Sequence, residues 1–121
     1  MPKKKKLPLR VKSKVWVEDK QGGAIFGEGR LEILEIVERS GSLHKASKEL
    51  KMSYRAVWGK IKATEQRLGM KLVETRVGGI RGGGSKLTSI AKELLARFKE
   101  LEERQVEMID GLFQEIFKDF L

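Results

Sequence analysis

Cysteine is absent from this chain of 121 residues, and histidine occurs once, at His44. Without thiols the chain forms neither disulfides nor thiolate metal sites, which suits a reducing compartment. A single imidazole cannot supply a cluster of histidine ligands, and no nucleophile has an obvious base close to it in the sequence. We therefore expect no metal, no cofactor and no enzymatic activity.

Long apolar runs are missing as well. No stretch approaches the length of a membrane span, and the lysines near the N-terminus are not followed by the apolar segment of a secretory signal. Apolar residues still make up 40% of the chain, enough for one modest core. We expect a cytoplasmic, nucleoid-associated protein with no membrane partner, built as one domain or one domain with a helical extension.

Positive charge outweighs negative charge and is unevenly spread. The net charge is +9, with +7 in residues 1–14, −3 in 15–41, +8 in 42–86 and −3 in 87–121. Acidic flanks around a basic centre are typical of a protein with a nucleic-acid face and a separate protein-binding face. Residues 1–10, which include Lys3–Lys6, are predicted to be a disordered basic arm: either a solvated tail or a source of salt-sensitive phosphate contacts.

A β-hairpin is predicted after this arm. Apolar and charged residues alternate between Val11 and Glu18, which favours a strand, and residues 19–23 have the composition of a turn before a returning strand at 24–26. Trp16 is expected to cover part of the core, with a DNA contact as the alternative. Residues 28–39 then form the first predicted helix, and its acidic outer face assigns it to the scaffold.

Two helix signals separated by a short turn follow. Ser42 is placed to cap a helix over residues 43–51, and Ser53 is placed to cap the next helix over residues 54–68. The small side chain of Ala46 would let the two helices cross closely, as a helix-turn-helix requires. This pair indicates a DNA-binding element.

Base contacts are expected from the N-terminal end of the second helix of this pair, because only that end enters deep into the major groove. The candidate DNA contacts of the pair are Ser42, Ser53, Tyr54, Arg55, Trp58, Lys60 and Lys62. Arg55 is suited to bidentate recognition of guanine. Trp58 either packs against the following loop or contacts the sugar–phosphate backbone, and Lys60 and Lys62 contact phosphate or are simply solvated. His44 is expected to be a surface or capping residue, with a phosphate contact as the alternative.

A glycine-rich loop follows between two predicted strands, residues 72–75 and 85–87. Five of the seven residues Gly78–Gly84 are glycine, which lets the backbone approach phosphates closely. We predict the wing of a winged helix here; an ordinary hairpin loop is the alternative. Arg81, at the tip, is suited to entering the minor groove. The candidate DNA contacts of this segment are Arg76, Arg81, Gly82, Gly83, Ser85 and Lys86.

Thr88 is placed to cap a long helix. From Leu87 to Leu112, apolar residues recur at alternating spacings of four and three, with one polar interruption at Gln105. This heptad pattern predicts pairing with the same helix of a second copy. The expected dimerisation residues are Leu94, Phe98, Leu101, Gln105, Met108 and Leu112.

These patterns together predict a mainly α fold with little β structure. A winged helix-turn-helix domain is expected over residues 11–87, and a linker and dimerisation helix over residues 88–121. The predicted function is sequence-specific binding of double-stranded DNA by a homodimeric transcription regulator. Two alternatives stay open: an architectural, chromatin-like protein that binds DNA without sequence preference, and a protein–protein adaptor.

Three segments, Ser40–Ala46, Met52–Trp58 and Gly78–Thr88, resemble the N-terminal domain of the molybdate-responsive (ModE-type) transcription regulators. The resemblance covers about residues 11–110, and the LysR-type family has a similar layout. It implies a homodimeric winged helix. It also implies that the major groove is faced by Ser53, Tyr54, Arg55 and Lys60, and that the backbone or minor groove is contacted by Gly82–Lys86.

The chain departs from this pattern in two ways. Ala91 replaces the glycine that usually follows the Leu-Thr start of the linker helix, which puts the path from wing to helix slightly in doubt. Full-length members bind their oxyanion in a separate C-terminal domain, and the present sequence does not contain that domain. We therefore expect no small-molecule ligand and no molybdate binding.

Overall fold

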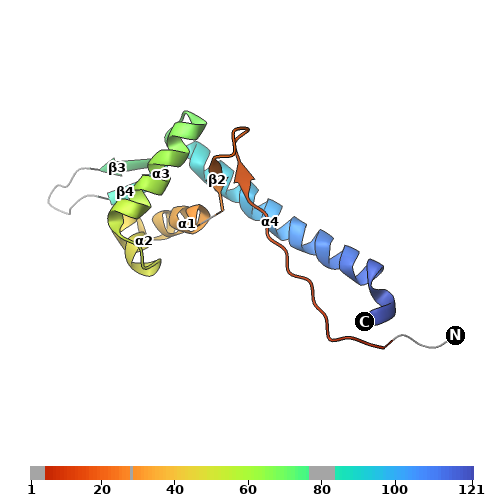
Figure 1. Cartoon of the computed structure of the whole chain (residues 1–121). Coiled ribbons are helices and arrows are strands. Elements are labelled where there is room, and N and C mark those ends of the chain that lie inside the picture. Colours follow the sequence, from red (N-terminus) through yellow and green to blue (C-terminus); the bar gives the residue numbers. More distant parts are fainter. Residues whose placement is uncertain (1–4, 28, 77–83) are drawn as a thin grey trace. The chain divides into compact units, whose positions relative to one another are not determined.

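The computed structural model describes residues 5–27, 29–76 and 84–121, and its fold is mainly α, as predicted (Figure 1). The elements in chain order are β1 (Val17–Glu18), β2 (Ala24–Phe26), α1 (Arg30–Ser40), α2 (Leu43–Glu49), α3 (Tyr54–Leu68), β3 (Val73–Arg76), β4 (Gly84–Leu87), α4 (Ser89–Ile116) and a short 3₁₀ helix (Lys118–Phe120). The strands form two antiparallel hairpins, β1–β2 and β3–β4.

The chain divides into two compact units. The first, Trp16–Phe98, contains both hairpins, α1 to α3 and the first part of α4; the second combines the described part of Met1–Val15 with Lys99–Leu121. The predicted domain boundaries after residues 10 and 87 stay predictions. Residues of α4 before Lys99 nevertheless already belong to the core of the first unit.

The core of the first unit forms where α1, α2 and α3 meet the strands and the beginning of α4. Ala46 is fully buried, and its small side chain lets α2 and α3 approach closely, as predicted. The largest fully buried side chains are those of Ile33, Leu34, Val37, Val57, Ile61, Thr64 and Leu72. Phe98 is only 4% exposed and stacks on Phe26, with ring centroids 5.2 Å apart. Phe98 therefore packs inside its own protomer, which corrects its predicted role at the dimer interface.

Hydroxyl side chains cap three helices, as the sequence predicts. Ser42 accepts a hydrogen bond from the Lys45 amide at 3.1 Å, Ser53 from the Ala56 amide at 3.0 Å, and Thr88 from the Ala91 amide at 3.2 Å. Each bond satisfies an amide that has no partner within its own helix. Consequently α3 and the start of α2 lie where predicted, whereas α2 ends at Glu49, two residues early, and α1 begins at Arg30.

The first hairpin is shorter than predicted. Only Val17 and Glu18 pair with β2, and the register shifts between these two residues. The alternation still governs burial, since Val11, Val15 and Val17 are half-buried while the lysines between them are exposed. Trp16 falls on the outer side of this alternation and is 53% exposed. The expectation that Trp16 covers the core is therefore wrong.

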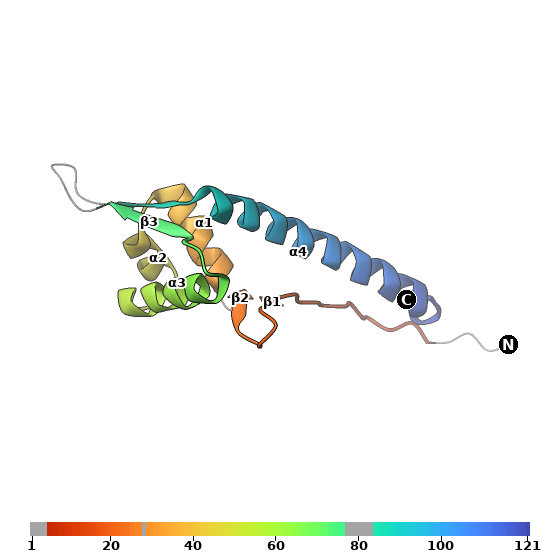
Figure 2. The ribbon, with the colours of Figure 1, turned by 90° about the horizontal axis from the view of Figure 1, so that it is seen from above.

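In the second unit, residues 5–15 run alongside the C-terminal part of α4 (Figures 1 and 2). The Leu7 amide donates a hydrogen bond to the Phe120 carbonyl at 2.7 Å. The ring of Phe117 contacts those of Phe113 and Phe120, with centroids 4.9 Å and 6.5 Å away. The described part of the predicted arm thus has a defined neighbour, although it forms neither helix nor strand.

Candidate nucleic-acid interface

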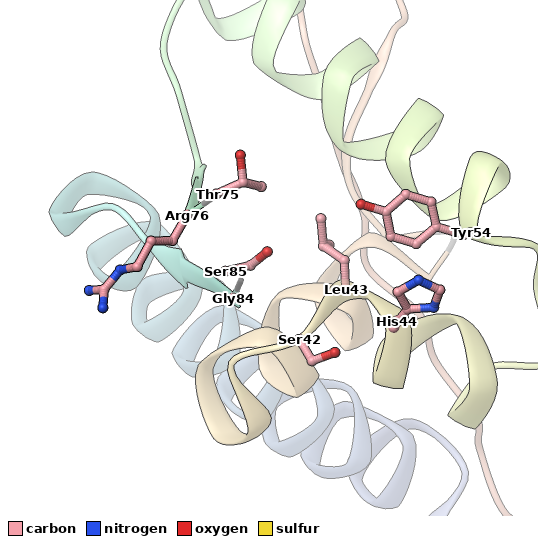
Figure 3. Close-up of a pocket in the computed structure, with 8 residues that line it drawn as sticks. All are labelled: Ser42, Leu43, His44, Tyr54, Thr75, Arg76, Gly84 and Ser85. Carbon is pink, nitrogen blue, oxygen red and sulfur yellow. The ribbon is translucent and has the colours of Figure 1, made fainter. Parts of the chain in front are cut away.

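A pocket of about 280 Å³ opens between the helix-turn-helix and the β3–β4 hairpin (Figure 3). It is lined by Ser42, Leu43, His44, Tyr54, Thr75, Arg76, Gly84 and Ser85. Four of the predicted DNA contacts, Ser42, Tyr54, Arg76 and Ser85, are therefore brought together around one cavity. These described lining residues include no carboxylate, so the pocket offers hydrogen-bond donors to an anion, with Arg76 at its rim.

Tyr54 is the first residue of α3, and it lines the pocket together with residues of α2 and of the β3–β4 hairpin. Its ring stacks on His44, with centroids 4.7 Å apart, and the side chain is 42% exposed. Figure 3 shows its hydroxyl directed toward Thr75 and Ser85, while the Arg76 guanidinium extends away from the cavity at its rim. The next residue along α3, Arg55, is exposed to solvent, as is the capping Ser53.

The middle of α3 is tied to the protein. Trp58 is half-buried against the core, which favours the packing role over the DNA contact. Lys62 places its Nζ 4.4 Å from the centre of the Trp58 ring and 3.2 Å from a carboxylate oxygen of Glu65. This double engagement argues against the predicted phosphate contact of Lys62. Lys60 is half-buried on the same helix.

The β3–β4 hairpin is attached to the turn between α1 and α2. The Ser85 amide donates a hydrogen bond to the Gly41 carbonyl at 2.8 Å. Arg76 and Gly84 form the outermost described pair, and Lys86 is exposed with its Nζ 3.8 Å from the Glu74 carboxylate across the ladder. The predicted contacts Arg81, Gly82 and Gly83 lie outside the described residues. The described strands thus hold Arg76 and Ser85 beside the N-terminal ends of α2 and α3.

Glu65 fixes the base of the same hairpin to α3. Its buried carboxylate accepts hydrogen bonds from the amides of Leu72 at 2.7 Å and Val73 at 3.1 Å. Burial by itself would raise the pKa of Glu65, but these two amides and the Lys62 ammonium outweigh it and hold the pKa below its usual value. Thr88 adds a bond from its hydroxyl to the Lys71 carbonyl at 2.9 Å.

The sequence analysis did not predict this bonding role of Glu65. A carboxylate on the apolar face of a helix was the available signal, since such a group is buried only when it is paired or hydrogen-bonded. Arg30 gives the same signal on α1, where its Nε donates to the Thr64 hydroxyl at 2.9 Å. Among the described residues, every buried side-chain polar atom has a hydrogen-bond partner.

The described acidic side chains lie outside the set of residues that line the pocket. Glu32 and Glu38 are exposed on α1, in agreement with its scaffold role. Glu49, at the end of α2, is bonded by Arg39 at 2.9 Å; this hydrogen bond lowers the pKa of Glu49. Within the part of the chain that the structure describes, no group of acidic or histidine side chains could hold a metal ion, and no helix is long and apolar enough to cross a membrane.

A tightly crossed helix pair with an exposed N-terminal end on its second helix, next to an anchored β-hairpin, defines a winged helix-turn-helix DNA-binding protein. The sequence model of the bacterial regulatory helix-turn-helix proteins of the lysR family matches residues 29–92. The chain belongs to this family, and it carries the DNA-binding module of a bacterial transcription regulator.

Known proteins also confirm the resemblance to ModE-type regulators. The molybdenum transport protein ModE of Azotobacter vinelandii is 31% identical over 98 residues, which are 81% of this chain and 36% of that protein. The transcriptional regulator ModE of Haemophilus influenzae is 34% identical over 76 residues, 63% of this chain and 30% of its own length. The chain thus spans about a third of the length of these relatives.

Solved structures give the same fold. Full-length LysG from Corynebacterium glutamicum, a LysR-type transcription regulator with bound effector Arg, superposes with a TM-score of 0.55 at 25% sequence identity. The match covers 77% of this chain and 30% of the LysG chain. The agreement therefore concerns about three quarters of this chain and under a third of LysG.

Proposed function

We propose that this chain binds double-stranded DNA in a sequence-specific manner as a homodimeric transcription regulator, that it works in the cytoplasm in association with the nucleoid, and that it is not an enzyme. The observation that carries the proposal is the pocket between helix-turn-helix and hairpin. It gathers hydroxyl groups and Arg76 beside the exposed end of α3. A helix that enters the major groove would bring backbone phosphates to this place.

The residues at this surface divide into two roles. Arg55 is the proposed base-reading residue, because it is exposed in the first turn of α3 and can bind guanine through two hydrogen bonds. The proposed backbone contacts are Ser42, Ser53, Tyr54, Lys60, Arg76, Ser85 and Lys86. Contacts of this second kind fix the orientation of the protein on the duplex but carry no sequence information.

The second copy is proposed to pair through α4. Leu101, Met108 and Leu112 recur at heptad spacing and are 43%, 67% and 46% exposed. The neighbouring side of the helix, at Ile109 and Phe113, is half-buried in the unit that contains residues 5–15. An exposed apolar stripe at heptad spacing is what a two-stranded helical interface requires. Gln105 is half-buried between these two sides.

Selection of duplexes from a random pool by the full chain tests the proposal. We expect a recurring sequence motif, and we expect the selected duplex to outcompete random DNA by a thousandfold or more in order of magnitude. Equal binding of selected and random duplexes would favour the architectural alternative. Failure to bind any duplex at low salt would favour the adaptor.

A further inference from the structure

His44 and Tyr54 connect the beginnings of α2 and α3 through their rings. The ring planes are inclined by only 27°, and the centroids are 4.7 Å apart. Both side chains are exposed, so the contact lies outside the hydrophobic core and contributes little to it. A stacked neighbour of this kind favours the Tyr54 rotamer that keeps the two rings in contact.

In this stacked orientation the Tyr54 hydroxyl points into the pocket (Figure 3). The opposite wall carries the hydroxyl groups of Thr75 and Ser85, and Ser42 adds a fourth from the side of α2. With no carboxylate among the described lining residues, an anion that enters meets hydrogen-bond donors and no like charge. In a protein that lays α3 along the major groove, the anion nearest this place is a phosphodiester of the DNA backbone.

We propose that His44 is a positioning residue for Tyr54, and that the hydroxyl it orients donates a hydrogen bond to a backbone phosphate of duplex DNA in this pocket. The inference rests on the proposed function. It adds to that function a positioning residue, His44, and a binding site for a backbone phosphate. His44 acts through the face of its ring and not through its nitrogen atoms. Another flat ring therefore replaces it, whereas a methyl group does not.

Three single variants and one double variant of the full chain test this inference. Each is titrated by fluorescence anisotropy with the duplex recovered by selection. H44A loses the stack and is expected to weaken binding roughly two- to tenfold, which corresponds to the stabilising energy of one aromatic ring pair. H44F keeps a ring and is expected to stay within about twofold of the wild type. Y54F keeps the stack but loses the hydroxyl, and it weakens binding as H44A does. The temperature of thermal unfolding should shift by no more than a few degrees in any of them, because both rings are exposed and only one ring pair is lost.

The double variant H44A/Y54F decides whether His44 acts through Tyr54. If it does, H44A adds no further loss once the hydroxyl is gone. Fully additive losses, equal losses in H44A and H44F, or unchanged binding by H44A would each overturn the inference. A wild-type chain that shows no preference for the selected duplex would instead remove the proposed function, and this inference with it.

Inorganic phosphate, added at constant ionic strength, distinguishes the source of the anion. We expect it to compete equally weakly with DNA in the wild type and in Y54F, since the pocket is completed only by the duplex. Competition that is strong in the wild type and absent in Y54F would assign the pocket to a free oxyanion and overturn the DNA assignment.

Discussion

Arg55 is the residue that we propose reads the DNA bases. It is exposed in the first turn of α3, one residue after Tyr54. We predict that Arg55→Ala costs about 1–3 kcal/mol of binding to the selected duplex, with much less effect on random DNA, because a bidentate base contact is lost. Competition titrations measure both affinities.

Arg97→Ala is the matched control for Arg55→Ala, because it removes one exposed arginine from α4 and leaves the helix-turn-helix intact. The control should leave the ratio of specific to random binding unchanged. If Arg55→Ala lowers both affinities by the same factor, Arg55 contacts phosphate and its base-reading role is wrong.

Glu65 links the stability of the wing base to pH. Its pKa is held below the usual value of 4.5 in the folded chain. Its contribution to stability is therefore fully present above pH 4.5 and is lost as the pH falls through the lower folded-state value. We predict that Glu65→Ala destabilises the fold by about 2–3 kcal/mol at neutral pH, because two buried amides lose their acceptor.

Urea unfolding over a range of pH measures this effect, with Glu74→Gln as the control because Glu74 is exposed on β3. The difference between wild type and Glu65→Ala should shrink as the medium becomes acidic. A difference that stays constant down to strongly acidic pH would contradict the assigned role of the carboxylate.

At the scale of the elements, Gly41 joins α1 to α2 and is the residue to which the β3–β4 hairpin is hydrogen-bonded. Its φ of 71° lies in the left-handed region, and its carbonyl accepts the bond from Ser85. We predict that Gly41→Ala destabilises the chain by about 1 kcal/mol through backbone strain. Gly59→Ala, inside α3 with open space for the added Cβ beyond the backbone of its own helix, should instead stabilise it by about 0.5–1 kcal/mol. Chemical denaturation that gives both changes the same sign would refute this account.

The elements also reveal what the sequence can predict. Helix ends that depend on local signals, such as the caps Ser42, Ser53 and Thr88, were correct, because each signal and its hydrogen bond lie within four residues. Partners distant in sequence were not predictable. Phe98 follows the heptad spacing but is drawn into the core by Phe26. The partners of Lys62 are local, since Trp58 and Glu65 lie within one turn of it on α3, and the sequence analysis missed them although helical spacing brings such residues together.

The candidate site was predicted as a set of residues and not as a cavity. The sequence pointed to Ser42, Tyr54, Arg76 and Ser85 separately, one segment at a time. Their meeting around one pocket depends on long-range contacts, above all the bond between Ser85 and Gly41, for which no local pattern exists. The stacking of His44 on Tyr54 was missed for the same reason, since it requires the crossing geometry of α2 and α3.

At the scale of the whole molecule, the proposal requires two copies. We predict that Met108→Glu raises the dissociation constant of the dimer by roughly a hundredfold or more, because it places a carboxylate from each copy in an apolar interface. Sedimentation velocity measures this shift. Gln114→Glu adds the same charge on another side of α4 and should leave the dimer intact. A wild-type chain that sediments as a monomer at high concentration would contradict the α4 interface.

The most direct test of the central claim is an NMR titration of the full chain with the selected duplex, followed through the backbone amides. The claim is that DNA is bound where the helix-turn-helix meets the hairpin. The account predicts that the largest shifts fall in residues 42–44, 53–55 and 84–86. Shifts confined to residues 99–121, or spread evenly over the chain, would contradict it.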